Sequence, residues 1–306
     1  MGIPDEPAHT LRTGRGYGSV VGETGVVELT RHHGLGNDFL ITFADYVPAD
    51  AADVARRLCD RMDGIGADGL VFGTPVAVSG EADWRFTLFN SDGSPAEVSG
   101  NGLRCFGQAL LRRQADGTSG LEAVVETPAG HRRITLVGSA TDLEVDATVE
   151  MGVAGTGPSI EGLDLDLGGF PVQAVDSTDF GNPHLVVVVD DPGAVDLASV
   201  GPVIESFFSP VGCNVNLVSV VDRSAVRLRT WERGAGLTRA CGSGACAAAH
   251  VLHGLGLVDD VVEVRMPGGV ATVTIGEPVR LAGPVTFVEV HTATTGSDPY
   301  GPPGDG

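Results

Sequence analysis

Two short segments of the chain place a side chain with an exchangeable proton just before the N-terminus of a predicted helix. Ser99 starts the sequence Ser-Gly-Asn-Gly, and Cys241 starts the sequence Cys-Gly-Ser-Gly. The first turn of a helix presents free amide groups and partial positive charge, so each segment predicts a binding site for an anion such as a carboxylate. Glycine lets the backbone approach that anion without an intervening Cβ atom.

The chemistry of the two side chains differs. The positive field of a helix N-terminus lowers the pKa of a cysteine, so we expect Cys241 to favour the thiolate and to act as a base. A serine hydroxyl is far less acidic and is a weak base until another group activates it, so Ser99 is the weaker partner. Removal of an amino-acid α-proton leaves charge that spreads onto the carboxylate. Two helix ends aimed at that carboxylate stabilise the transition state more than the ground state.

The two segments lie in blocks that repeat one pattern. In the first block, a predicted strand (Arg85–Phe89) is followed by nine residues, then by Ser99 and a predicted helix. In the second block, the strand Ala225–Trp231 is followed by nine residues, then by Cys241 and a helix. The matched order and spacing indicate a duplicated lobe, with two unrelated glycine turns as the alternative. Two related lobes would place one acid/base residue on each face of a single carbon, as inversion of a stereocentre requires.

The basic residues exclude two kinds of chemistry. All 19 of them are arginines, because the chain contains no lysine. A pyridoxal phosphate enzyme needs a lysine for its Schiff base, and a P-loop needs a lysine on the bound phosphates. The five cysteines form no CxxC pair and have no metal-ligand spacing, which predicts no metal site. We therefore expect an enzyme without a cofactor.

Composition and charge narrow the class of protein further. A chain of 306 residues with 42% hydrophobic residues can form two domains with buried cores. Its formal charge of −21 argues against nucleic acids and anionic membranes as partners, since both need a basic surface. Residues 1–26 contain no apolar region of a secretory signal, and no stretch approaches the ~20 apolar residues of a membrane-spanning helix. These features and the unpaired cysteines predict a cytoplasmic location.

Short β-rich runs dominate the chain between its two ends. The predicted strands are Val27–Thr30, Phe39–Phe43, Arg85–Phe89, Leu185–Val189, Val215–Val221, Ala225–Trp231, Val261–Arg265, Ala271–Ile275 and Val285–His291. The predicted helices cover about residues 50–61, 102–114 and 244–254. Many strands and few helices favour an α+β fold over a doubly wound sheet.

We expect two lobes with flanking segments outside them. The N-terminal lobe comprises residues 27–140 together with 283–293, and the C-terminal lobe comprises 141–282, with the junction near 138–148. The composition of residues 1–26 and 294–306 predicts a disordered leader and a disordered tail.

At the level of motifs, the chain resembles the diaminopimelate epimerases over about residues 27–293. Any one of the matching motifs is weak, but eight of them in the order of the family are specific. They are His33-Gly-Leu-Gly-Asn-Asp-Phe, Gly64-Ile-Gly-Ala-Asp-Gly-Leu, Asn90-Ser-Asp-Gly-Ser, Ser99-Gly-Asn-Gly-Leu-Arg-Cys, Gly181-Asn-Pro-His, Gly212-Cys-Asn-Val-Asn, Glu232-Arg-Gly-Ala-Gly and Ala240-Cys-Gly-Ser-Gly-Ala.

The resemblance implies a fold and a set of site residues. The implied fold has two pseudo-symmetric lobes, each a curved and mostly antiparallel sheet around a central helix, and the implied assembly is a homodimer. Cys241 corresponds to one of the two acid/base cysteines of the family. The residues implied to hold the reacting α-carboxylate are Gly100, Asn101, Gly242 and Ser243. The residues implied to bind the distal amino-acid end are Asn37, Asn90, Asn182, Asn214 and Arg233. Glu232 and His184 match positions that support the substrate and the catalytic cysteines.

The chain departs from the family pattern at two positions. Ser99 stands where members usually carry the second cysteine, and Leu237 stands where they usually carry glutamate. The resemblance implies interconversion of LL- and meso-diaminopimelate in lysine and peptidoglycan-precursor synthesis. Because Ser99 touches the mechanism, two alternatives stay open. One is a racemase, epimerase or dehydratase of another amino acid, and the other is a catalytically impaired homologue that binds substrate.

Overall fold

The computed structural model describes residues 26–76, 81–114 and 118–294. The predicted leader and tail therefore lie outside the described residues, apart from Val26 and Thr294, which end strands. Seventeen strands and four helices make up the described ranges, so the fold is mostly β and fits the expected α+β class only roughly. No helix in these ranges is long and apolar enough to cross a membrane.

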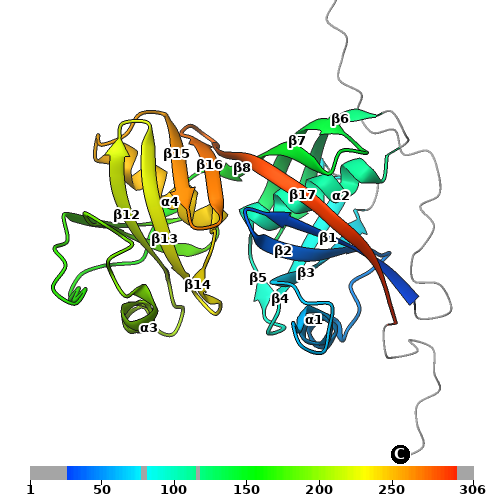
Figure 1. The fold of residues 1–306 in the computed structure, drawn as a ribbon, viewed down its shortest axis with the longest axis horizontal. Helices are drawn as coiled ribbons and strands as arrows, with labels where there is room; N and C mark the ends of the chain where they lie inside the picture. Colours follow the sequence, from blue (N-terminus) through cyan, green and yellow to red (C-terminus); the bar gives the residue numbers. More distant parts are fainter. Residues whose placement is uncertain (1–25, 77–80, 115–117, 295–306) are drawn as a thin grey trace, which may run out of the picture.

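The elements fall into two consecutive sets, which lie beside each other in Figure 1, except that the last strand of the second set runs across the first. The first set is β1 (Val26–Gly34), β2 (Asn37–Phe43), α1 (Ala51–Cys59), β3 (Gly69–Pro75), β4 (Trp84–Asn90), β5 (Pro95–Ala96), α2 (Gly100–Arg112), β6 (Ser119–Thr127), β7 (Gly130–Ser139), β8 (Glu144–Gly152) and β9 (Gly155–Thr156). The second set is β10 (Ala174–Asp179), β11 (Pro183–Val188), α3 (Leu197–Phe207), β12 (Asn214–Asp222), β13 (Ala225–Glu232), β14 (Gly236–Thr238), α4 (Gly242–Gly254), β15 (Val261–Met266), β16 (Gly269–Thr274) and β17 (Val279–Thr294). They are called the first and second halves below.

The second half repeats the strand pairing of the first. In the first half, β1–β2 is antiparallel, β2–β3 parallel, β3–β4 antiparallel, β4–β6 parallel and β6–β7 antiparallel. In the second half, β10–β11, β11–β12, β12–β13, β13–β15 and β15–β16 follow the same alternation. The matched loops before Ser99 and Cys241 are thus parts of a longer structural repeat.

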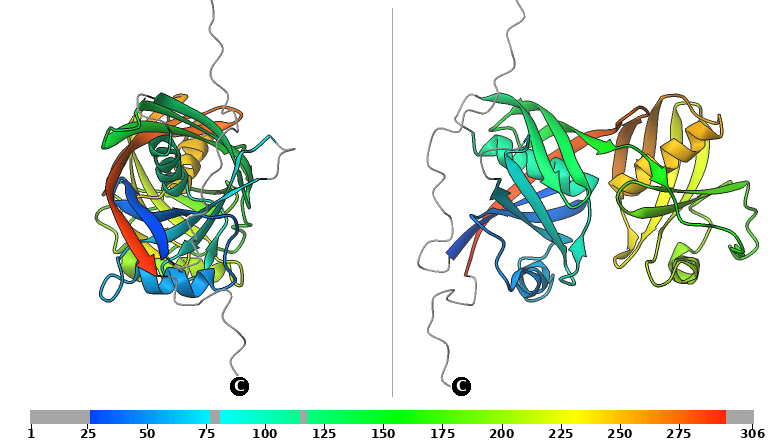
Figure 2. Two further views of the ribbon diagram at one scale, coloured as in Figure 1. Left: turned by 90° about the vertical axis from the view of Figure 1, so that its right-hand side faces the viewer. Right: turned by 180° about the vertical axis from the view of Figure 1, so that it is seen from behind.

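One buried helix lies inside the strands of each half. Both helices, α2 and α4, have 13 residues, and strands surround them in the two views of Figure 2. Nearly every residue of α2 is buried, and α4 is rich in small apolar residues such as Ala247 and Ala248. Both helices are therefore covered on all sides by other elements. The surrounding sheet thereby fixes where each helix begins.

Two strands cross between the halves at the centre of the molecule. β8 and β17 pair antiparallel, from Val279 opposite Gly152 to Thr286 opposite Glu144. β17 pairs with β16 at one end and continues along β1 at the other, so it closes the first half with residues from the end of the chain (Figure 1). In return, β9 follows β8 and pairs with β10. The domain limits expected from the sequence remain a prediction. Their junction, near 138–148, covers the end of β7, the following turn and the start of β8.

The crossing strands support both central helices. A Cβ atom built at Gly100 would lie 2.7 Å from Cδ2 of Leu281, and one built at Gly242 would lie 2.8 Å from the same atom. Leu281 belongs to β17 and is fully buried. A single leucine therefore packs under the first turns of α2 and α4.

The predicted helices match three of the four observed ones. The two central helices begin two residues earlier than expected, because their glycine-rich first turns have low helix propensity. Helix α3 was not predicted, because it contains Gly201 and Pro202. A Cβ at Gly201 would lie 2.6 Å from the Trp231 ring, so close packing of this helix on β13 explains the glycine.

We predict that Leu281→Ala loosens both helix N-termini together. Truncation of a buried leucine costs about 2–5 kcal/mol, and here the cavity opens under two helices at once. Amide hydrogen exchange should rise in the first turns of both α2 and α4. The matched control is Leu136→Ala, because Leu136 is equally buried but packs at Gly107, in the middle of α2. Faster exchange in only one helix of Leu281→Ala would contradict the shared support.

Candidate active site

A cavity of about 940 Å³ lies between the two halves. Twelve of the thirteen residues predicted from the sequence line it: Asn37, Asn90, Ser99, Gly100, Asn101, Asn182, Asn214, Glu232, Arg233, Cys241, Gly242 and Ser243. The exception, His184, is fully buried behind the wall. The structure thus gathers residues from both halves around one space.

Ser99 and Cys241 occupy equivalent positions at the two helix N-termini. Each is the N-cap residue with an extended backbone, at φ −138° and ψ 114° for Ser99 and φ −122° and ψ 114° for Cys241. Oγ of Ser99 accepts a hydrogen bond from the Gly102 amide at 3.0 Å. Sγ of Cys241 accepts one from the Gly244 amide at 3.3 Å. These contacts are N-caps formed by the two candidate acid/base groups.

The two helix N-termini touch each other. A Cβ at Gly242 would lie 3.1 Å from the Cα of Gly100 and 3.3 Å from the Asn101 nitrogen. Only glycine permits this approach, and it brings two sets of free amide groups to one place. Two partial positive charges in contact favour a bound anion between them.

Asn101 joins the two halves beside Cys241. The fully buried Arg104 donates to Oδ1 of Asn101 at 2.5 Å, which leaves the amide nitrogen as the donor. That nitrogen, Nδ2, donates to Oδ1 of Asn37 at 3.1 Å and to the Ala240 carbonyl at 3.1 Å. Arg104 therefore fixes the orientation of an amide that ties α2 to the residue before Cys241.

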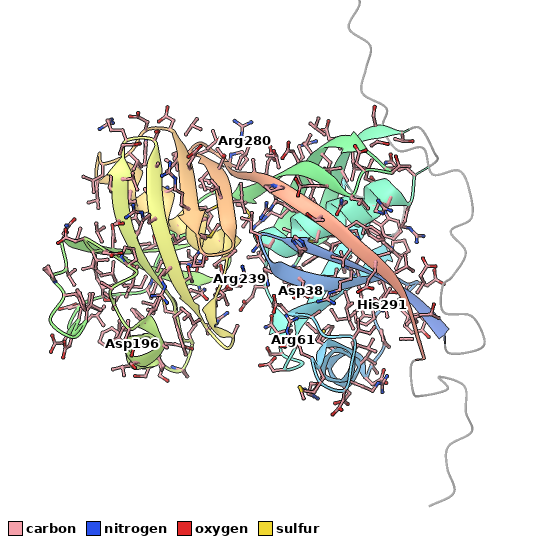
Figure 3. The ribbon with its side chains drawn as sticks, viewed as in Figure 1. Asp38, Arg61, Asp196, Arg239, Arg280 and His291 are labelled. Atoms are coloured by element: carbon pink, nitrogen blue, oxygen red, sulfur yellow. The ribbon has the colours of Figure 1, made fainter. Side chains whose placement is uncertain are left out.

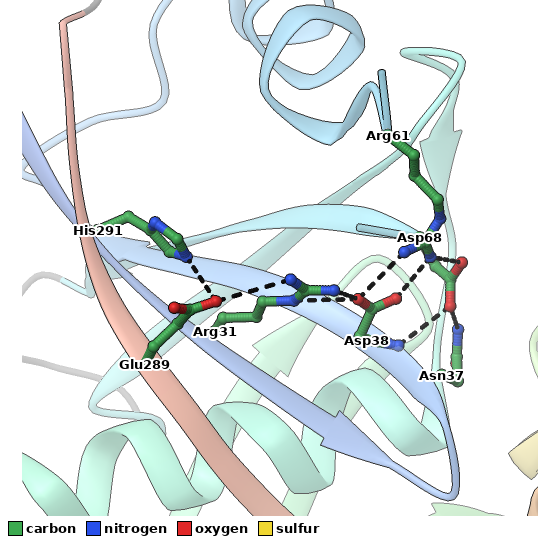
Figure 4. Close-up of polar contacts among 7 residues, drawn as sticks. All are labelled: Arg31, Asn37, Asp38, Arg61, Asp68, Glu289 and His291. Atoms are coloured by element: carbon green, nitrogen blue, oxygen red, sulfur yellow. Dashed lines mark hydrogen bonds and ion pairs between the residues drawn. The ribbon is translucent and has the colours of Figure 1, made fainter. Parts of the chain in front are cut away.

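An ion-pair network holds Asn37 at the cavity wall (Figure 4). Nδ2 of Asn37 donates to Asp68 at 2.7 Å. Arg61 donates to Asp38 and to Asp68, each at 2.7 Å, and Arg31 also pairs with Asp38. The two arginines hold the pKa of the Asp38 carboxyl below its usual value, although burial opposes them. Figure 3 places Asp38 and Arg61 on the side of the first half that faces the second.

The guanidinium of Arg233 already pairs with a carboxylate of the protein. Nη2 of Arg233, in the second half, donates to both oxygens of Glu97, in the first half, at 3.0 and 2.8 Å. The Arg233 backbone amide donates to Oδ1 of Asn214 at 3.0 Å, and its Nη1 donates to the Val211 carbonyl at 3.0 Å. The guanidinium is thus held by its own half and presents one edge to a carboxylate across the cavity.

The remaining predicted residues make contacts within the protein. Nδ2 of Asn214 donates to the Pro183 carbonyl at 2.9 Å, and Nδ2 of Asn90 donates to Ser94 at 3.0 Å. Nε2 of His184 lies 3.0 Å from Oδ1 of Asn182. Burial, and to a lesser degree the charge of Arg233, lowers the pKa of His184 to about 3, so its ring is neutral.

The expected acidity of Cys241 is wrong for the free protein. Burial raises the pKa of the thiol well above its usual value, and the adjacent Glu232 carboxylate raises it further. The hydrogen bonds from Gly244 and Ser243 lower it but do not compensate. Burial also raises the pKa of Glu232, whose Oε1 accepts from Thr238 at 2.6 Å. The Gly244 amide at the helix N-terminus lowers the pKa of the thiol, but desolvation outweighs it.

Sequence reasoning missed several residues at this cavity. It did not include Arg31, Asp38, Arg61, Asp68, Glu97 and Arg239, all of which line the cavity. Asp38 and Asp68 are part of the quoted motifs, so their motif positions were the available signal. Leu237, which stands where family members usually carry glutamate, is 43% exposed and lines the cavity too.

Comparison with known proteins shows the family to which the chain belongs. The family model described as diaminopimelate epimerase matches residues 29–156 and 177–288. A protein named diaminopimelate epimerase from Rhizorhabdus wittichii is 39% identical over 291 residues, covering 90% of this chain and 97% of that protein. One of the same name from Desulforudis audaxviator is 40% identical over 278 residues, covering 86% and 97%.

Solved structures with the same fold are more distant in sequence. A hydroxyproline epimerase from Agrobacterium vitis has a TM-score of 0.67 at 18% identity, covering 89% of this chain and 93% of that one. A phenazine biosynthesis protein of the PhzF family from Enterococcus faecalis has a TM-score of 0.60 at 11% identity, covering 88% and 99%. These similarities establish the fold.

We predict that Glu232→Gln makes Cys241 more reactive. Loss of the negative charge lowers the pKa of the thiol, so at pH 7 a larger fraction is thiolate and iodoacetamide reacts faster. Peptide mass spectrometry identifies the alkylated cysteine. Glu97→Gln is the matched control, since Glu97 lines the same cavity but pairs with Arg233. An unchanged or slower reaction in Glu232→Gln would contradict this account of the thiol.

Proposed function

We propose that this chain, which belongs to the diaminopimelate epimerase family, interconverts LL- and meso-2,6-diaminopimelate by proton transfer at one α-carbon. The observation that carries the proposal is the pair of N-cap residues, Ser99 and Cys241, on two touching helix ends in one cavity. We further propose that it acts in lysine and peptidoglycan-precursor synthesis in the cytoplasm. Each chain has two pseudo-symmetric lobes, and two chains form a homodimer.

The reaction needs no pyridoxal in this proposal, because the chain has no lysine to carry it. The reacting carboxylate binds between the first turns of α2 and α4, where free amides stabilise the charge that develops as the α-proton leaves. Gly100 and Gly242 have no side chain, which lets the two turns meet above Leu281, and Asn101 and Ser243 follow them in the two turns.

Proton transfer begins at Cys241, which is a thiol in the free protein. Glu232 has a raised pKa and faces the sulfur, so it can take the thiol proton when the positively charged ammonium group of the substrate enters. The thiolate then removes the α-proton from one face. Ser99, or a water beside it, delivers a proton to the opposite face and is reprotonated from solvent. Glu232 releases the thiol proton to solvent, which restores the starting site. In the reverse direction the groups exchange roles.

The distal amino-acid end binds at Arg233. In the free protein, the carboxylate of Glu97 makes two contacts with this guanidinium, which supports binding of a carboxylate there. The distal carboxylate of the substrate would displace Glu97. Asn37, Asn90, Asn182 and Asn214 line the cavity and are proposed to bind the distal end with it.

Two alternatives remain for experiment. A racemase, epimerase or dehydratase of a single-headed amino acid would leave Arg233 without a substrate partner. A homologue that binds substrate but turns it over poorly is favoured by one observation, the hydroxyl of Ser99 in place of a thiol.

The direct test is incubation of the purified protein with LL-diaminopimelate, with chiral chromatography of the products. We expect meso-diaminopimelate to form until both isomers are present in comparable amounts. Cys241→Ala should form none while its thermal unfolding stays near that of the parent. Binding of LL-diaminopimelate without conversion would support the impaired homologue. Efficient racemisation of lysine or proline would support the other-substrate alternative.

We predict opposite effects on KM from the two partners of the ion pair. Arg233→Ala should raise KM and lower kcat/KM by about 10²-fold or more, because a buried carboxylate loses its partner. Glu97→Gln should lower KM, because it removes the carboxylate that competes for Arg233. Steady-state kinetics measure both. A higher KM in Glu97→Gln would mean that Glu97 assists binding instead of competing with the substrate.

We predict that Ser99→Cys raises kcat/KM in both directions by a similar factor. The two isomers are close in free energy, so the ratio of the forward and reverse rates is fixed by equilibrium. A general acid–base group contributes about 10²–10⁴-fold, which bounds the gain. Initial rates from LL- and from meso-diaminopimelate provide the measurement. A fall in activity would show that the serine has an adapted role.

A further inference from the structure

We propose that a chain of five side chains with one fixed direction of hydrogen bonding aims the Ser243 hydroxyl hydrogen at the sulfur of Cys241. The chain, called the relay below, consists of Thr230, Asn216, His184, Asn182 and Ser243, in this order. Its four links measure 3.0, 3.1, 3.0 and 3.4 Å between donor and acceptor atoms. Oγ of Ser243 then lies 3.7 Å from Sγ of Cys241, within hydrogen-bond distance for sulfur.

The direction of the relay is set at Asn216, which is fully buried. One end of its amide lies 2.9 Å from the Leu185 backbone carbonyl, and a carbonyl can only accept. That end must therefore be Nδ2, and the other end is Oδ1. Thr230, also buried, donates its hydroxyl hydrogen to this Oδ1. The orientation of Asn216 thus follows from a backbone group that cannot change its role.

The remaining links follow from this anchor. Nδ2 of Asn216 donates to Nδ1 of His184, so Nδ1 carries no hydrogen and Nε2 carries it. Nε2 of His184 then donates to Asn182, which requires Oδ1 at that end and Nδ2 at the other. Nδ2 of Asn182 donates to Oγ of Ser243. With its oxygen accepting, the Ser243 hydroxyl has its one hydrogen available for Cys241.

The relay supplies the sulfur with a second donor. Sγ of Cys241 already accepts from the Gly244 amide, and a hydroxyl donor adds to the stabilisation of the thiolate. Both donors lower the pKa of the Cys241 thiol. They oppose the Glu232 carboxylate, which faces the sulfur from β13 and raises that pKa. The relay thereby assists the step in which Glu232 takes the thiol proton.

The first half has no such donor for Ser99 in the described part of the chain. Asn101 holds the position in α2 that Ser243 holds in α4, two residues after the N-cap. Its Nδ2 donates to Asn37 and to the Ala240 carbonyl instead. The second half, with Cys241, therefore has a hydroxyl donor that stabilises a negatively charged side chain. The described part of the first half, with Ser99, has none.

This inference assigns Asn216 and Thr230 as positioning residues, which act on Cys241 through His184, Asn182 and Ser243. It rests on the proposed role of Cys241 in the reaction. Its tests measure the His184 tautomer and the acidity of the sulfur, and neither depends on turnover. A failure of the relay is thus distinguishable from a failure of the proposed function.

Nitrogen-15 NMR of histidine-labelled protein tests the direction of the relay. We expect the His184 ring to be neutral with its hydrogen on Nε2, without protonation above pH 5. The charge of Arg233 near the ring and the burial of the ring both favour the neutral form. A hydrogen on Nδ1, or protonation between pH 6 and 8, would overturn the proposal in the unmodified protein.

The pH dependence of alkylation by iodoacetamide tests the last link. Ser243→Ala should move the midpoint of Cys241 alkylation upward by about one pH unit or more, the size expected for loss of a hydrogen bond to a charged group. Ser243→Thr, which keeps the hydroxyl, should restore the parent midpoint. Thr230→Val should produce a smaller shift in the same direction, and Thr230→Ser should reverse it.

Thr42→Val is the matched control for loss of a buried hydroxyl. Thr42 is buried in β2 of the first half and donates to the Glu28 carbonyl, outside the relay. In Thr42→Val, the midpoint of Cys241 alkylation should equal that of the parent. An unchanged midpoint in Ser243→Ala, or an equal shift in Thr42→Val, would overturn the proposal.

Discussion

Contact between two helix N-termini is the constraint on which the rest of the structure depends. At Gly100 and Gly242, two first turns with unsatisfied amides and partial positive charge meet with no side chain between them. Such a contact is unfavourable unless the surrounding structure enforces it. The enforcement comes from the crossing strands, because Leu281 packs under both turns and each half is closed by a strand from the other. The strands that cross between the halves therefore also hold together the two helix ends at the cavity.

The groups around this contact balance its positive field. Glu232 lies beside Cys241, Glu97 occupies Arg233, and the Asp38 and Asp68 carboxylates pair with arginines at the cavity wall. The free protein therefore holds its thiol protonated and its distal guanidinium paired. An entering amino acid brings a carboxylate for the helix ends and an ammonium group near Glu232. The ammonium group lowers the pKa of the thiol, whereas the carboxylate offsets the positive field of the helix ends, so the reactivity of Cys241 depends on the charges that the occupant brings.

How much the sequence predicts depends on whether a property is local or tertiary. The N-cap roles of Ser99 and Cys241 are local, and glycine spacing together with motif order was enough to place twelve predicted residues at one cavity. The acidity of Cys241 is tertiary, because it depends on burial and on Glu232, and the expected thiolate was wrong. The pairing of Glu97 with Arg233 joins residues 136 positions apart and leaves no local pattern. Helix α3 was missed because Pro202 contradicts local propensity, while packing against Trp231 favours the helix.

The central claim is that the two helix ends present Cys241 and the Ser99 side to opposite faces of one carbon. The most direct test is the fate of deuterium when LL-diaminopimelate reacts in D₂O and is analysed by mass spectrometry at low conversion. Two groups on opposite faces predict that the meso product carries deuterium at the inverted carbon, while recovered LL-diaminopimelate carries almost none. Deuterium entering the recovered LL isomer as fast as the product forms would show that one group exchanges the proton on a single face, which contradicts the account.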